Sequence, residues 1–184
     1  MNLRKIALAF SVFGCTMYAN VTSALGVDER ENWKSWQPVG QAQLKVLFFD
    51  IYQSTLLSPD GLYRRSEDIT PHPLALSIHY QRDISQKQLI DATDEQWEIL
   101  GYSASDRSTW IRQLESIFPD IEQGQKLAYV TDGKVGHFYY DRYGQFVPIG
   151  AVDNETLNDA FLAIWLSPET QYPNLRRRLI GEKQ

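Results

Sequence analysis

The stretch that decides the fold runs from Lys126 to Ile149 and reads KLAYVTDGKVGHFYYDRYGQFVPI. Three short segments in it, 126–131, 135–140 and 145–149, are rich in β-branched and aromatic residues. Asp132-Gly133, between the first two, is the preferred pair for a tight type I′ hairpin, and Arg142-Tyr143-Gly144 makes a looser return. The stretch therefore predicts an antiparallel meander of three strands.

Two more strands are predicted on the N-terminal side of the meander. Residues 44–52, LKVLFFDIY, are largely apolar on both alternating faces, which predicts a central strand covered on both sides. Residues 74–80 alternate, which predicts a strand with one apolar face. The polar segment 25–37 contains Trp33 and Trp36, and we expect it to dock through their indole rings.

Helices are predicted between and after the strands. Ser85-Gln86-Lys87-Gln88 has the form of a capping box and begins a helix that Gly101 closes. A second helix begins near Ser105 or Asp106 and stops at Pro119. Asp153 is predicted to cap a third, amphipathic helix, and a short fourth one covers about 174–180. This order predicts an α+β fold with helices on one face of an antiparallel sheet.

The N-terminal residues indicate export. Arg4 and Lys5 precede an uncharged, mostly apolar run too short to span a bilayer, and Thr22 and Ala24 suit signal peptidase. We expect a signal peptide over 1–24, a single domain over 25–184 and a periplasmic or secreted protein. Cys15 leaves an alternative, because the residues before it loosely resemble a lipobox that would make the protein a lipoprotein anchored there.

Composition narrows the function classes. The chain has 18 basic and 23 acidic residues, and loss of Arg4 and Lys5 with the signal changes the net charge from −5 to −7. This balance argues against nucleic acid as a partner, and no membrane span is expected. The three histidines have no ligand spacing, and P-loop, G-x-G-x-x-G and G-x-S-x-G motifs are absent. We therefore expect no metal and no cofactor.

Aromatic residues make up 12% of the chain and are concentrated in the predicted strands. Aromatic side chains on a sheet with few charges line an apolar ligand cavity in some proteins and fill a plain core in others. The residues alone leave both interpretations open.

Five segments, in their order and spacing, resemble the bacterial chalcone-isomerase-like proteins over about residues 33–181. They are Gly40-Gln41-Ala42-Gln43-Leu44-Lys45, Phe49-Asp50-Ile51-Tyr52, Ile78-His79-Tyr80-Gln81-Arg82-Asp83, Phe118-Pro119-Asp120-Ile121 and Asp159-Ala160-Phe161-Leu162-Ala163-Ile164-Trp165-Leu166. The resemblance implies an open-faced β-sandwich, with a large antiparallel sheet packed by helices on one side and a ligand cleft between them.

What the family does with this cleft sets the functional alternatives. The plant enzyme closes a chalcone into a flavanone, and non-catalytic relatives hold a fatty acid through arginine and tyrosine. Lys45 lies near the position of the enzyme's arginine, Tyr52 replaces its threonine, and the helix after Ser85 has no tyrosine at the catalytic place. Asn158 falls near a polar position of the late helix, with the solvent face of that helix as the alternative.

The resemblance therefore implies binding more than catalysis. We expect a binder of a small amphipathic ligand, such as a fatty acid or lipid, whose carboxylate contacts Lys45, Tyr52, Tyr80 or Arg82. The alternative for Arg82 is a surface pair with Asp83. Two other functions remain open. One is an isomerase or intramolecular lyase acting on an unsaturated carbonyl compound, and the other is a structural or interaction module without a cleft.

Overall fold

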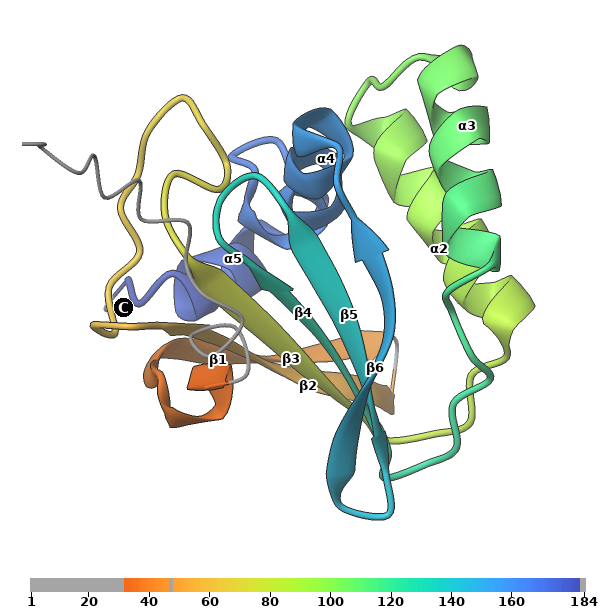
Figure 1. Cartoon of the computed structure of the whole chain (residues 1–184), viewed down its shortest axis with the longest axis horizontal. Helices are drawn as coiled ribbons and strands as arrows, with labels where there is room; N and C mark the ends of the chain where they lie inside the picture. The colour runs from red at the N-terminus through yellow and green to blue at the C-terminus, as the bar shows by residue number, and fades with distance from the viewer. Residues whose placement is uncertain (1–31, 47, 183–184) are drawn as a thin grey trace, which may run out of the picture.

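A single six-stranded antiparallel sheet organises the protein. The computed structural model describes residues 32–46 and 48–182, and the strands follow one another across the sheet in chain order (Figure 1). The strands are β1 Gln37–Val46, β2 Phe49–Ser58, β3 Leu74–Tyr80, β4 Lys126–Thr131, β5 Gly136–Arg142 and β6 Gln145–Val152. The predicted meander of β4, β5 and β6 is confirmed, and β1 and β6 form the two edges.

The prediction of one central strand over 44–52 is wrong. The chain reverses within this run, since Val46 pairs with Phe49 and Lys45 pairs with Asp50 across the β1–β2 hairpin. β1 is moreover an edge strand. The middle of the run lies at an exposed hairpin tip, where Phe48 is 97% exposed. Two-sided burial was the wrong explanation of the pattern.

The two meander turns have exchanged the expected forms. Arg142 pairs with Gln145 across a two-residue turn, and Tyr143 and Gly144 both have positive φ, as a type I′ turn requires. The other turn spans four residues, since Thr131 pairs with Gly136. There the Asp132 carboxylate accepts hydrogen bonds from the backbone N–H groups of residues 134 and 135, which stabilises a wider turn than predicted.

The predicted order of helices is confirmed. The helices are α2 Gln86–Ile99, α3 Ala104–Glu115, α4 Glu155–Leu166 and α5 Pro173–Leu179, and a 3₁₀ turn, η1, covers Asn32–Ser35. Ser85 and Gln88 form the predicted capping box of α2, and Gly101 takes the positive φ expected just beyond the helix end. The cap of α4 is Asn154 rather than Asp153, because Asn154 accepts the hydrogen bond from the Leu157 N–H.

The helices and η1 pack on opposite faces of the sheet. The main core lies between the four helices, α2, α3, α4 and α5, and one face of the sheet. The β3 side chains on this face are all buried, namely Leu74, Leu76, Ile78 and Tyr80. A small second cluster occupies the other face, where the indole of Trp33 covers small side chains of β3 and β4. The α+β fold class, an open-faced sandwich with helices on one side, is thus confirmed (Figure 1).

Candidate functional site

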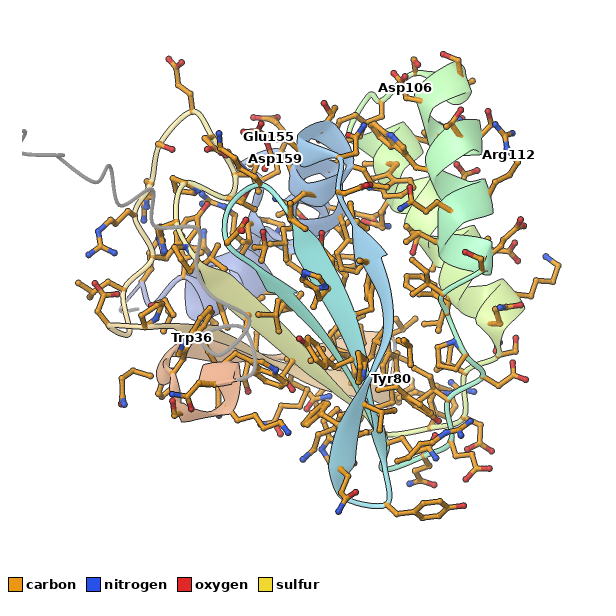
Figure 2. All side chains as sticks on the ribbon, viewed as in Figure 1. Trp36, Tyr80, Asp106, Arg112, Glu155 and Asp159 are labelled. Carbon is orange, nitrogen blue, oxygen red and sulfur yellow. The ribbon has the colours of Figure 1, made fainter. Side chains whose placement is uncertain are left out.

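An apolar cavity of about 380 Å³ lies between the helical layer and the end of the sheet where β3 leads into α2. Tyr80, the last residue of β3, lines the cavity, and Figure 2 shows it at this end of the sheet. The volume is within the range of small-molecule sites, roughly 300–1,000 Å³. The sheet and the loop after β3 contribute Leu44, Val46, Ile51, Tyr52, Ile78, Tyr80, Arg82, Ile84 and Leu127, and the rest of the chain contributes Gln88, Leu89, Ala92, Thr93, Glu95, Gln96, Phe118, Phe161, Ile164, Trp165 and Tyr172.

The helical wall of the cavity is fixed by a hydrogen bond between its two helices. The buried Trp97 indole of α2 donates to the Ala160 carbonyl of α4 at 2.7 Å. A buried indole N–H needs an acceptor, and this one holds the two helices at a fixed spacing. Thr93 of α2 and Trp165 of α4 line the cavity from these two helices, and hydrogen bonds orient them, from Thr93 to the Leu89 carbonyl and from Trp165 to Tyr52.

Two tyrosines from neighbouring strands place hydroxyl groups at the sheet wall. Tyr52 of β2 pairs with Tyr80 of β3, and their rings meet edge to face with centroids 5.9 Å apart. The Tyr52 hydroxyl accepts a hydrogen bond from the Trp165 indole N–H at 2.9 Å. Burial raises the pKa of both phenols well above its usual value. Both groups therefore stay neutral at ordinary pH and act as hydrogen-bond donors.

The Tyr80 hydroxyl is a hydrogen-bond donor that the fold leaves available at the site. Tyr80 is 5% exposed and lines the cavity, and no hydrogen bond joins its hydroxyl to another side chain or to the backbone within residues 32–46 and 48–182. The hydroxyl is not among the fully buried unpaired polar atoms of this part of the chain, which are Trp33 Nε1, Arg107 Nε and Asp141 Oδ1. A polar ligand atom in the cavity could therefore accept a hydrogen bond from it.

Arg82 is the cation at the mouth of the cavity. Its side chain lines the cavity, and its guanidinium lies 5.8 Å from the centre of the Phe49 ring. The alternative of a surface pair with Asp83 is wrong, because the Asp83 carboxylate accepts from the Gln123 N–H at 2.8 Å and Arg82 makes no ion pair with the described residues. Within the described residues, the guanidinium therefore has no carboxylate partner, and it could bind an anion.

Lys45 does not join these residues. It is not among the residues that line the cavity, and its ammonium forms an exposed ion pair with Asp50 at 2.9 Å across the β1–β2 hairpin. Lys45 therefore lies near the position of the family's arginine in the sequence, but its side chain does not line the cavity. Arg82, from the neighbouring strand end, supplies the cation there.

Asn158 is also placed outside the cavity lining, although it is fully buried and not on the solvent face. Its amide donates to the Thr70 hydroxyl at 2.9 Å and to the Gly133 carbonyl at 3.3 Å, and its oxygen accepts from the Tyr129 hydroxyl at 2.9 Å. These bonds join α4 to the loop before β3 and to the β4–β5 turn. Figure 2 shows Glu155 and Asp159 of α4 at the end of the sheet opposite to Tyr80.

Sequence reasoning missed the helical side of the site. Trp165, Thr93 and Gln96 line the cavity and were not among the expected ligand contacts. The spacing of Thr93 and Trp165 on their helices directed both side chains towards the sheet. It gave no sign of which helical residues face a cavity and which face the packed core.

Metal ligands are not gathered around the cavity or elsewhere in residues 32–46 and 48–182, where no three histidine, cysteine, aspartate or glutamate side chains are placed to hold an ion. The same part of the chain has no helix whose length and hydropathy would let it cross a bilayer. Cys15 and the predicted signal peptide lie outside the described residues.

The fold and the cavity together define an open-faced α+β domain with an apolar site between sheet and helices. Residues 39–181 match the model of the chalcone isomerase-like family, and the chain belongs to this family. An uncharacterized protein of Haemophilus influenzae is 27% identical over 147 residues, which cover 80% of this chain and 69% of that protein.

Proposed function

We propose that the protein binds a small amphipathic ligand with an acyl chain and an acidic head, such as a fatty acid. The Tyr80 hydroxyl and the Arg82 guanidinium, which line one largely apolar cavity, carry this proposal. The acyl chain would lie against the aliphatic and aromatic side chains of the cavity. The carboxylate would lie at the mouth, between the Tyr80 hydroxyl and the guanidinium of Arg82.

The groups at the mouth favour an anionic head over a cationic one. Arg82 and Glu95 both line the cavity, both are exposed, and neither forms an ion pair within the described residues, so the preference rests on the hydrogen-bond donors beside Arg82. A guanidinium and a neutral phenol both donate hydrogen bonds, and a carboxylate accepts them. The Tyr52 hydroxyl accepts a hydrogen bond from the Trp165 indole and can still donate its own proton, so it adds a further donor to the site.

Isothermal titration with dodecanoate tests the proposal. Tyr80→Phe removes only the hydroxyl, and we expect affinity to fall by about 10-fold to 150-fold, since a hydrogen bond to a charged group contributes about 1.5–3 kcal/mol. Arg82→Gln should weaken dodecanoate binding similarly and remove the preference for it over a dodecyltrimethylammonium ion. Tyr143→Phe, at an exposed hairpin turn, is the matched control and should change nothing. Failure of the unaltered protein to bind dodecanoate would refute the proposal.

The alternatives are less well supported. A filled core without a cleft is contradicted by the cavity beside Tyr52. An isomerase that polarises a carbonyl with Lys45 and Tyr52 requires both groups in one cavity, and Lys45 does not line it. Turnover of an enone that Tyr52→Phe abolishes would restore the enzyme interpretation.

We further propose that the protein acts after export. The basic residues Arg4 and Lys5, the apolar run and the small residues Thr22 and Ala24 support cleavage near Ala24. The mass of the protein isolated from its native compartment tests this proposal. A chain beginning near Leu25 supports it, and an acylated N-terminal Cys15 would show the lipoprotein alternative instead.

A further inference from the structure

The turn between β1 and β2 presents an apolar surface that the fold leaves uncovered. We define the β1–β2 tip as Val46, Phe48 and Phe49, which are 47%, 97% and 62% exposed. Soluble domains usually place polar residues at hairpin turns, and adjacent exposed phenylalanines mark a contact surface. Tyr143, fully exposed in the β5–β6 turn, adds an aromatic side chain at the same end of the sheet (Figure 1).

The β1–β2 tip is continuous with the mouth of the cavity. Val46 belongs both to the tip and to the cavity lining, and Arg82 lines the cavity while it lies over the ring of Phe49. An acyl chain leaving the cavity would therefore pass directly onto the tip. If the tip and the mouth of the cavity face the same apolar phase, a ligand can pass between that phase and the cavity.

We propose that the β1–β2 tip inserts into the surface of a neutral phospholipid bilayer, so that the cavity exchanges its ligand with the lipid phase without passing through water. This inference rests on the proposed function for the nature of the ligand. The docking itself rests on the exposure of the tip and on its continuity with the cavity.

The size of the tip favours a bilayer over a protein partner. A phenylalanine buries about 150–250 Å² at most, so the two exposed rings and Val46 offer roughly 300 Å² of apolar surface. A stable protein interface buries about 800 Å² on each partner. A small aromatic hairpin end is enough for reversible insertion at the interfacial region of a bilayer, where aromatic side chains concentrate.

The charges around the tip favour a neutral surface over an anionic one. Lys45 forms an ion pair with Asp50, and Arg82 is followed in the chain by Asp83, so the flanks of the tip carry both signs. The chain as a whole has a net charge of −5, which repels anionic headgroups. Apolar insertion, rather than electrostatic attraction, is therefore the binding force.

Flotation with phosphatidylcholine vesicles tests docking. The unaltered protein should float, and Phe48→Ser should lower the vesicle partition coefficient about tenfold or more, because burial of a phenylalanine side chain contributes about 1.5–3 kcal/mol. The fold should tolerate the change, because Phe48 is almost fully exposed. Leu62→Ser is the matched control, an exposed apolar residue 57% accessible beyond the far end of β2, roughly 30 Å away, and it should float as the unaltered protein does.

Two further measurements separate the outcomes. Dodecanoate titration in vesicle-free buffer should be unchanged in Phe48→Ser, since Phe48 does not line the cavity. Dodecanoate binding by a protein that does not float would overturn docking and leave the proposed function standing, whereas flotation without dodecanoate binding would refute the proposed function alone. Sedimentation that shows a dimer dissolved by Phe48→Ser, without flotation, would overturn docking in favour of a second copy as the occupant.

Discussion

Replacement of Asn158 by alanine separates a structural from a ligand-binding role for this residue. The substitution removes three buried hydrogen bonds and leaves the Tyr129 hydroxyl without an acceptor, while Thr70 still donates to the Gly133 carbonyl. One orphaned buried group costs about 1–3 kcal/mol, and the lost side-chain contacts add to this. We expect the free energy of unfolding to fall by about 2–4 kcal/mol.

Urea denaturation followed by tryptophan fluorescence measures this change, and the melting temperature should fall by roughly 5–15 °C. Dodecanoate affinity measured well below the transition should stay within about twofold, because Asn158 does not line the cavity. Thr156→Ala, an exposed position on the same helix, is the control and should shift stability by no more than about 0.5 kcal/mol. An Asn158→Ala protein of unchanged stability with weakened binding would refute this reasoning.

Three other predictions concern the scaffold and its pH response. Gly40→Ala should destabilise the protein by about 1–3 kcal/mol or more in urea denaturation, because the new Cβ would lie 2.0 Å from the Arg178 carbonyl oxygen of α5; an unchanged midpoint would show that α5 moves freely on β1. Trp97→Phe should cost about 1–3 kcal/mol and weaken dodecanoate binding, since it removes the bond that sets the spacing of α2 and α4; unchanged stability and affinity would contradict this role. Burial raises the pKa of the Asp159 carboxyl above its usual 3.8, so ionisation of this group opposes folding. The cost is absent below pH 3.8 and develops as the pH rises from there through the folded pKa. Stability measured against pH should therefore fall less over this pH range in Asp159→Asn than in the unaltered protein, and parallel curves would disprove the assignment.

The elements predicted correctly are those that local rules determine. The capping box of α2 uses only side chains four positions apart or fewer, and the alternation of β3 needs only one buried face. The meander follows because strands joined by short turns pair with their neighbours. The fold class could be inferred from these elements and their order, and the resemblance to a known family agreed with it.

The site could not be predicted in the same way, because tertiary packing creates it. Tyr52, Tyr80 and Arg82 are brought to the cavity by the pairing of β2 with β3 and all three line it, while their contact with a ligand stays a prediction. Lys45 and Asn158 were placed by alignment to a family position alone, and neither lines the cavity. Trp165 was seen only as a member of an apolar stripe, since its hydrogen bond to Tyr52 spans 113 positions in the chain.

The one element assigned wrongly is also the element from which docking is inferred. A run that is apolar on both alternating faces ordinarily lies inside a protein, and burial of Val46, Phe48 and Phe49 would have been the simplest result. The chain instead turns there and exposes all three beside the mouth of an apolar cavity. A sequence departs from the local rules chiefly where function requires it, because exposed phenylalanines promote association and bring no stability to the monomer. The exposed tip therefore calls for a functional explanation, and contact with an apolar phase is the one that also explains its position next to the cavity.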